Sequence, residues 1–362
     1  LHIDNCYYIP NLKLISHRCK TNTQSATAFR GFGGPQGMFG IETVIEQIAN
    51  DIGKDPLDVR LLNIYKDPAV SGNPATMVTQ YGQTIADWVG DKVIDQVASE
   101  AKYRERRDSV NAFNKVNKRR KRGLALVPLK FGISFTATML NQGGALLNIY
   151  MDGSVSCNHG GTEMGQGLNT KMAQVCADGL GIDIKYVRVT GTDTQKVPNA
   201  SATSASSGAD INGAAIMNAT AQMRARLAPV AANMLGCKEA DVSFSNSMAH
   251  GGGKSVEWAA VAKQAWLDRV GLSVTGFYMT PEIKYDFATL TGHAFYYYCY
   301  GASVSEVEID TRTGEYWIKA VDIVHDAGKS INPAIDKGQI EGGYVQGMGW
   351  LTMEECIWDK KG

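Results

Sequence analysis

The feature that most constrains this chain is a glycine-rich segment near its beginning, residues 28–36, which reads Ala-Phe-Arg-Gly-Phe-Gly-Gly-Pro-Gln. Three glycines and a proline among nine residues are incompatible with a continuous helix or an ordinary strand. We therefore predict a loop whose backbone adopts unusual conformations or approaches another group closely. Its arginine and two phenylalanines would suit a flat ligand that is anionic or heteroaromatic. A tight connection packed into a core explains the same residues equally well.

Length and composition narrow the class of protein. At 362 residues the chain is long enough for two domains. Its 36 basic residues equal its 36 acidic ones, so no net field favours nucleic acid or an anionic membrane as a partner. No apolar run could span a bilayer and no signal peptide is visible, so we expect a cytoplasmic protein. The seven cysteines are scattered and form no Cys-x-x-Cys pair, which argues against structural zinc and against a disulfide framework.

The spacing of apolar residues predicts an α+β fold with mixed sheets and packed helices. We expect helices over residues 38–52, 57–65, 85–115, 168–180, 211–235 and 255–270, and a last helix from residue 332. Strands are expected over residues 124–127, 145–150, 155–158, 186–190 and 242–244, and a long hairpin should join 302–309 to 317–323. The basic run 115–122 is interpreted as a solvated helix end and connector rather than an RNA or lipid patch. No dinucleotide-binding fingerprint is present.

Four segments share one chemistry, being rich in glycine, small residues and backbone N–H groups. They are residues 28–36, 159–167, 198–208 and 338–343. The second follows a predicted strand and opens a predicted helix, where free N–H groups can bind an anion such as phosphate. Together the four predict a large ligand held by backbone rather than by charge. The last helix also carries many glycines, each costing about 1 kcal/mol relative to alanine, so a partner should press against it.

Three titratable residues could serve as a general base or as metal ligands: Glu163, His159 and His325. Glu163 lies just before a predicted helix, where its ionised form is favoured, which suits a general base poorly. We therefore predict that Glu163 caps or braces the loop. His159 and His325 are interpreted as structural, because neither has a second metal ligand at a suitable spacing.

Longer motifs connect these segments to a known family. Residues 29–36, 130–136, 160–167 and 332–336 closely resemble the molybdopterin-binding region of the xanthine dehydrogenase/aldehyde oxidase family. The resemblance runs in order over essentially the whole chain, and residues 33–36 and 131–136 favour the xanthine dehydrogenase branch. It implies that residues 1–122 form the largely helical C-terminal part of one molybdopterin-binding domain. Residues 123–362 would then form the α+β N-terminal part of a second domain.

The resemblance also implies cofactors, partners and an activity. The cofactor would be molybdenum–molybdopterin, in which the pterin dithiolene holds the metal and the protein contributes no metal ligand. The 2Fe-2S clusters, FAD and NAD of such an enzyme would lie outside this chain, in an iron–sulfur/FAD subunit or domain. The implied activity is that of an oxidoreductase of purine metabolism, which hydroxylates hypoxanthine to xanthine and xanthine to urate. A homodimer is the implied assembly of the complete enzyme.

By position, the family's functional residues fall on matching residues here. Phe32 and Phe135 would sandwich the purine, Thr136 would hydrogen-bond it, and Ala205 would lie beside both substrate and metal. The implied cofactor contacts are Phe29, Arg30, Gly31, Met164, Gly165, Gln166, Ala205, Ser206 and Gln339. Gly208 stands where some relatives have serine, which removes one hydroxyl contact.

The family's catalytic base, a glutamate in a Gly-Glu-Pro-Pro context, has no counterpart in this sequence. We therefore expect an internal fragment that is inactive alone. Two alternatives stay open: a sibling molybdenum hydroxylase acting on another N-heteroaromatic ring or an aldehyde, and a non-catalytic scaffold domain without cofactor.

Overall fold

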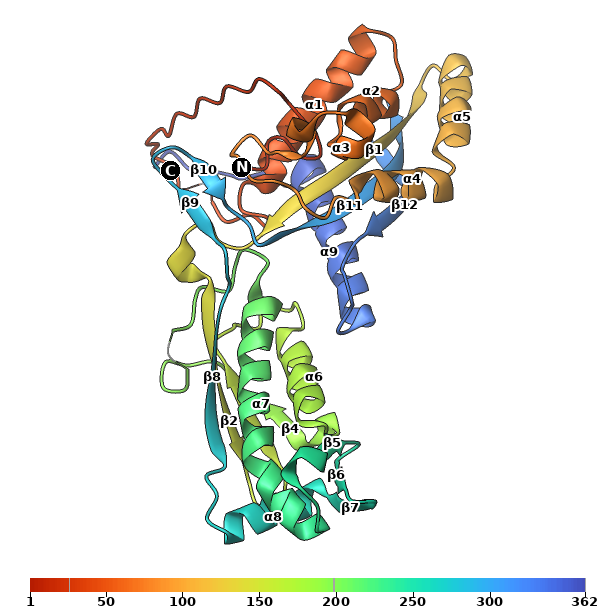
Figure 1. Cartoon of the computed structure of the whole chain (residues 1–362). Coiled ribbons are helices and arrows are strands. Elements are labelled where there is room, and N and C mark those ends of the chain that lie inside the picture. Colours follow the sequence, from red (N-terminus) through yellow and green to blue (C-terminus); the bar gives the residue numbers. More distant parts are fainter. Residues whose placement is uncertain (26, 198, 362) are drawn as a thin grey trace. The chain divides into compact units, whose positions relative to one another are not determined.

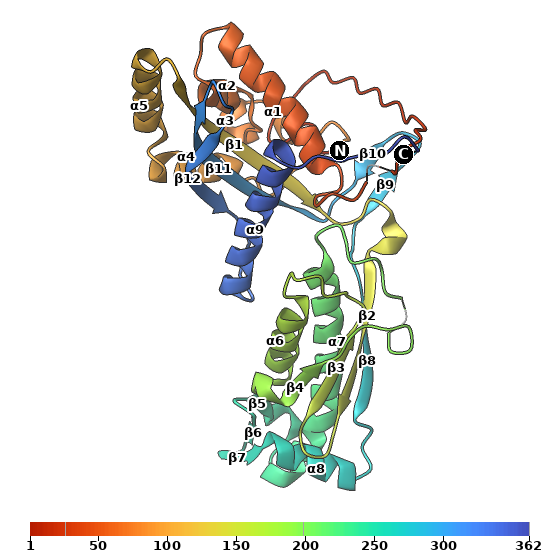
Figure 2. The same ribbon diagram turned by 180° about the vertical axis from the view of Figure 1, so that it is seen from behind.

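The computed structural model describes residues 1–25, 27–197 and 199–361, and it confirms the α+β expectation. The chain folds into two compact units. Figures 1 and 2 show the chain coloured along its sequence, from red at the N-terminus to blue at the C-terminus. The first unit comprises residues 1–133, 283–328 and 353–362, and the second comprises 134–282 and 329–352. The final residue, 362, lies outside the described residues. The boundary at 122/123 expected from the family resemblance concerns family domains and stays a prediction.

The first unit is built on an antiparallel sheet in the order β1-β11-β12. Its strands are β1 (Arg120–Ile133), β11 (Tyr297–Asp310) and β12 (Tyr316–His325), and a separate hairpin is formed by β9 (Lys284–Asp286) and β10 (Thr291–His293). The helices are α1 (Gly34–Asp51), α2 (Pro56–Asn63), α3 (Pro68–Ser71), α4 (Gly90–Glu100) and α5 (Tyr103–Val116), with a short 3₁₀ turn at Pro74–Met77. Buried tyrosines are prominent in its core, among them Tyr7, Tyr65, Tyr81 and Tyr300.

A buried ion pair ties the start of the chain to β1. The Lys130 ammonium donates to Asp4 Oδ2 at 2.8 Å, and both side chains are almost fully buried. The Tyr65 hydroxyl donates to the same oxygen at 2.6 Å. The ammonium also lies 5.0 Å from the Tyr65 ring centre and 4.8 Å from that of Tyr298. Because each charge has several partners, the pair tolerates burial, and removing either charge would leave the other uncompensated.

The second unit is built on a four-stranded sheet in the order β4-β3-β2-β8. Its strands are β2 (Gln142–Ile149), β3 (Val155–His159), β4 (Val187–Val189) and β8 (Ser273–Met279). Helices α6 (Leu168–Leu180) and α7 (Gly208–Leu235) lie side by side along this sheet (Figure 2). Further elements are β5 (Ser243–Ser245), β6 (Met248–Gly251) and β7 (Lys254–Glu257), which form a small sheet, α8 (Trp258–Leu267), α9 (Pro333–Thr352), and 3₁₀ turns at Thr138–Leu140, Ile184–Tyr186 and Glu239–Asp241.

Several predicted elements appear where expected, and α6 matches its predicted bounds exactly. The helix predicted over 85–115 is wrong as a single element. It is two helices, α4 and α5, separated at Lys102, whose φ of 50° is left-handed. The expectation that residues 28–36 contain no helix is also wrong at its end, since α1 begins at Gly34 with a proline in its first turn.

The basic run 115–122 is not simply a solvated connector. Strand β1 begins at Arg120, and its first residues lie opposite acidic residues of β11. Arg122 Nε lies 2.9 Å from Glu308 Oε2, and Arg119 Nη2 lies 2.7 Å from Asp310 Oδ2. The three arginines of the run, Arg119, Arg120 and Arg122, are therefore each paired with an acidic residue of β11. Among the described residues, no helix is long and apolar enough to cross a membrane.

The packing of α7 on β8 yields the first prediction. A Cβ at Gly276 would lie 2.1 Å from the backbone oxygen of Ala215 in α7. We expect Gly276→Ala to force the helix off the sheet and to lower the free energy of unfolding by about 1–3 kcal/mol. Urea unfolding followed by circular dichroism would measure this loss. Gly191→Ala is the matched control, because a Cβ there meets nothing within 4 Å in the described chain. Equal effects of the two substitutions would contradict the prediction.

Candidate functional site

The loop at residues 29–34 in the first unit presents a phenylalanine to the surface. Gly31, Phe32 and Gly33 all have left-handed backbone, with φ of 93°, 47° and 94°. The Phe32 N–H donates to the Phe29 carbonyl at 2.8 Å, and the Gly34 N–H donates to the Gly31 carbonyl at 3.1 Å. The resulting tight turn leaves the Phe32 side chain 72% exposed. A non-glycine residue with left-handed φ costs about 1–3 kcal/mol, which the surrounding turn has to offset.

In the second unit, the Glu163 carboxylate closes the loop that precedes α6. Its Oε1 accepts from the N–H groups of Gly165 and Gly167 at 2.9 and 3.0 Å, and its Oε2 accepts from Asn169 at 2.9 Å. Partial burial acts to raise the pKa of Glu163, but these backbone donors outweigh it and lower the pKa below its usual value. The predicted bracing role is therefore confirmed. The expected anion site at this helix end is wrong for these N–H groups, because the chain's own carboxylate occupies them.

His159 is a buried structural residue, as predicted. The Gly161 N–H donates to His159 Nδ1 at 3.1 Å, so the other nitrogen carries the proton and donates to Asn169 Oδ1 at 3.1 Å. Burial lowers the pKa of His159 below its ordinary value, which keeps the ring neutral. The histidine thereby joins the end of β3 to the first turn of α6.

Both ends of the Gln166 amide are held by the same loop. Its oxygen accepts from the Met164 N–H at 2.5 Å, and its nitrogen donates to the Thr162 carbonyl at 2.9 Å. Met164 itself is 66% exposed, and a Cβ at Gly165 would meet nothing within 4 Å in the described chain. The loop therefore combines a rigid interior with an open outer surface.

The third segment packs against the second. Pro198, its first residue, lies outside the described residues. The Thr162 N–H donates to Thr203 Oγ1 at 2.8 Å, and a Cβ at Gly160 would lie 2.5 Å from the Ala200 side chain. Ala205 and Ser206 both have a φ of 57°, two successive left-handed residues without glycine, just before α7. Such strain persists only where the surroundings impose it, and it concentrates at functional sites.

The first turn of α9, which precedes the fourth segment, and the residue before it are joined to α6. The Lys171 ammonium pairs with Asp336, and the Asn332 amide donates to Gln174 Oε1 at 2.9 Å. A Cβ at Gly167 would lie 2.7 Å from Ile335, so α9 also contacts the second segment. Gln339 is half-buried on this helix. Cβ atoms at Gly338, Gly342 and Gly347 would meet nothing within 4 Å in the described chain, so the partner expected against these glycines is not found there.

A further residue holds Phe135 and was missed by sequence analysis. Buried Asn141 accepts the Phe135 N–H at 2.8 Å and donates back to the Phe135 carbonyl at 2.8 Å. Phe135 and Thr136 are half-buried beside it. No pattern in the sequence marks Asn141, because its role depends on a turn that is visible only in the fold.

The structure therefore brings segments 159–167 and 199–208 into contact in the second unit. Segment 338–343 lies in the same unit, on a helix whose first turn contacts segment 159–167 through Ile335. The loop with Phe29, Arg30 and Phe32 belongs to the first unit. In the described part of the chain, no group of three His, Cys, Asp or Glu side chains could hold a metal ion. The side chains that these segments expose include the Met164 thioether and the hydroxyls of Ser204 and Ser206. This set fits a cofactor that brings its own metal ligands.

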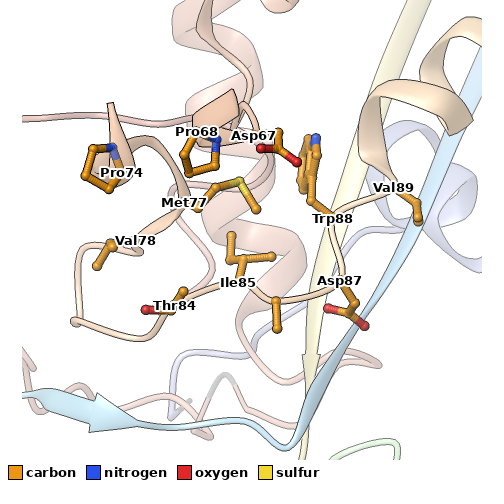
Figure 3. Close-up of a pocket in the computed structure, with 11 residues that line it drawn as sticks. Asp67, Pro68, Pro74, Met77, Val78, Thr84, Ile85, Asp87, Trp88 and Val89 are labelled. Carbon is orange, nitrogen blue, oxygen red and sulfur yellow. The ribbon is translucent and has the colours of Figure 1, made fainter. Parts of the chain in front are cut away.

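A separate hollow in the first unit contains none of the predicted site residues. Its volume is about 540 Å³, and Figure 3 shows Asp67, Met77, Ile85 and Trp88 among the residues that line it. It lies between the loop after α2 and the start of α4.

Comparison with known proteins identifies the family to which this architecture belongs. Residues 96–362 match a molybdopterin cofactor-binding domain, and residues 1–64 match a second domain with the same description. The chain belongs to the molybdopterin cofactor-binding domain family. The resemblance inferred from the motifs is thus confirmed, and so is the molybdopterin cofactor expected from it.

Individual relatives of this molybdopterin cofactor-binding chain are xanthine dehydrogenases. It is 44% identical to the xanthine dehydrogenase of Emericella nidulans over 359 residues, covering 99% of this chain and 24% of the relative. It is 45% identical to that of Drosophila pseudoobscura pseudoobscura over 362 residues, covering 100% and 25%. The xanthine dehydrogenase/oxidase of Gallus gallus is 43% identical with the same coverage. The chain spans about a quarter of the length of the curated relatives it matches.

Solved structures confirm the fold. Quinoline 2-oxidoreductase from Pseudomonas putida 86 superposes with a TM-score of 0.75 at 24% identity, covering 92% of this chain and 42% of that one. The aldehyde oxidoreductase from Desulfovibrio gigas gives a TM-score of 0.68 at 22% identity, covering 89% and 32%.

The Glu163 geometry yields the second prediction. We expect Glu163→Ala to destabilise the start of α6 by about 1 kcal/mol, because three backbone donors lose their acceptor. Folding lowers the pKa of Glu163, so the carboxylate stabilises the folded protein fully at any pH above its pKa in the unfolded chain. This stabilisation is lost as the pH falls through the lower pKa that Glu163 has in the folded protein. Amide exchange of residues 165–169, measured across this pH range, would report the change.

Glu257→Ala is the matched control, since Glu257 precedes α8 but makes no side-chain cap. Unchanged exchange at residues 165–169 in Glu163→Ala would show that the carboxylate does not hold the loop.

Proposed function

We propose that this chain forms part of the cofactor- and substrate-binding region of a molybdenum oxidoreductase that hydroxylates purines, hypoxanthine to xanthine and xanthine to urate. The observation that carries the proposal is 43–45% identity with xanthine dehydrogenases over the whole chain. The family match to molybdopterin cofactor-binding domains supports the same assignment.

In this proposal each site residue has a physical task. Phe32 and Phe135 contact the purine faces and edges and set its orientation. Asn141 fixes the Phe135 backbone, and Thr136 donates or accepts a hydrogen bond at the ring edge. Loop residues bind the cofactor: Phe29, Arg30, Gly31, Met164, Gly165, Gln166, Ala205, Ser206 and Gln339. When bound, the cofactor supplies the redox chemistry, while these residues bind, orient and exclude water.

The left-handed backbone at Ala205 and Ser206 supports a role at the reacting centre. Both residues carry a Cβ and both have a φ of 57°, so the backbone just before α7 is held in a conformation that costs about 1–3 kcal/mol for each of them. Ala205 would then give the substrate close access to the metal.

The complete enzyme in this proposal includes parts outside this chain. Electrons would leave through 2Fe-2S clusters and FAD to NAD, carried by an iron–sulfur/FAD subunit or domain. A homodimer, a cytoplasmic location and the domain boundary at 122/123 belong to the same proposal.

The activity test uses the intact protein loaded with cofactor. We expect it to convert xanthine to urate, with Phe135→Ala lowering kcat/KM about 10- to 100-fold, since stacking on a base contributes about 1–3 kcal/mol. Phe277→Ala, on the exposed face of β8, should leave kcat/KM unchanged. If the protein oxidised aldehydes or other N-heterocycles but not xanthine, the purine assignment would be overturned. An intact protein that folds but contains no molybdenum would favour the scaffold alternative.

A second test concerns residues 1–362 alone. No Gly-Glu-Pro-Pro glutamate is present in them, so we expect no urate formation from this segment. We also expect this segment to fold but to retain little cofactor. It offers fewer contacts to the cofactor than the complete enzyme would, and those contacts would have to offset the whole entropic cost of binding. Molybdenum analysis of the purified segment measures retention, and stoichiometric metal would contradict this prediction.

A further inference from the structure

The loop that presents Phe32 rests on the edge of another aromatic ring, Phe131 of β1. A Cβ built on Gly34 would lie 2.6 Å from Phe131 Cε2 and 3.4 and 3.5 Å from the two neighbouring ring carbons. Because the distances to Cδ2 and Cζ are nearly equal, Gly34 lies beside the edge of the ring and faces its Cε2 atom. Gly34 is buried, so the backbone of the loop and the first turn of α1 approach the ring as closely as glycine allows.

His2 fixes the face of the same ring. The two rings are stacked, with centres 4.3 Å apart and planes inclined by 14°. The Gly132 N–H donates to His2 Nε2 at 3.0 Å, which locks the imidazole against β1. Burial lowers the pKa of His2 to about 4, so Nε2 remains an acceptor at neutral pH.

The stack is anchored in the core of the first unit. Phe295 lies 5.0 Å from the His2 ring, and a Cβ at Gly132 would lie 2.2 Å from the Phe295 ring. Gln83 holds the backbone of Phe295, donating to its carbonyl at 2.7 Å and accepting its N–H at 3.1 Å. A continuous set of contacts therefore runs from buried Gln83 through Phe295, His2 and Phe131 to the loop.

We propose that Phe131 is a positioning residue for the substrate loop: its clamped ring sets the position of residues 29–34, and Gly34 is required so that the loop can rest on it. The role in catalysis depends on the proposed function, whereas the mechanical support of the loop does not. A methyl group at residue 34 would push the loop outward by about 1 Å, and a displacement of that size can cost about 10²-fold in rate.

The experiment compares Gly34→Ala, Phe131→Leu and the double variant in the intact, cofactor-loaded protein. We expect Gly34→Ala to lower kcat/KM for xanthine about 10- to 100-fold. We expect the double variant to recover much of that loss, because leucine lacks the ring edge that the methyl group meets. In the same intact proteins prepared without cofactor, trypsin cleavage after exposed Arg30, followed by mass spectrometry, reports loop position without requiring activity. Cleavage should accelerate in Gly34→Ala and slow again in the double variant.

Two controls lie on the same helix. Gly40→Ala adds a methyl group where nothing lies within 4 Å in the described chain, and Phe39→Leu shortens an exposed ring. Neither should alter cleavage at Arg30 or xanthine turnover. If Gly34→Ala does not fold, Phe131→Leu alone should still speed cleavage at Arg30, because the loop loses its support.

The outcomes separate the two proposals. No recovery in the double variant, or cleavage in Phe131→Leu equal to wild type, would overturn the positioning role. Absence of xanthine turnover in the wild-type protein would overturn the proposed function, and the cleavage comparison would still decide the inference.

Discussion

The first unit depends on the buried Asp4–Lys130 ion pair. It joins the first residues of the chain to β1, and both partners are almost fully buried. Such a pair stabilises only when further hydrogen bonds satisfy it, and the Tyr65 hydroxyl with the two flanking aromatic rings meets that need. The next residue along β1 is Phe131, so the ion pair also determines where the support of the Phe32 loop begins.

The glycines of the candidate site serve two different purposes. Gly34 and Gly160 allow backbone to approach a ring or a neighbouring loop more closely than any side chain would permit. Gly165 and Gly167 instead adopt left-handed backbone, and Gly165 faces open space. The close approaches shape the protein itself, and they include Gly167, where a Cβ would lie 2.7 Å from Ile335. Gly165 alone of these four leaves open space beside the loop.

Much of the fold could be predicted from local sequence, because apolar spacing marks helices such as α6 directly. The break at Lys102 could not, since a lysine in left-handed conformation carries no sequence signal. The bracing role of Glu163 followed from its place before a helix, yet its occupation of the neighbouring N–H groups was visible only in the fold. Asn141 and His2 were missed because their partners, Phe135 and Phe131, are positioned by turns and tertiary packing.

The Glu163 carboxylate has a consequence for the order of assembly. Because it satisfies three backbone donors of the loop before α6, the loop reaches its shape when the second unit folds, without an external anion. The conformational entropy of ordering it is then lost during folding and not during binding. A ligand that contacts this loop would therefore meet a backbone that is already ordered, and its binding would not have to supply the free energy of ordering it.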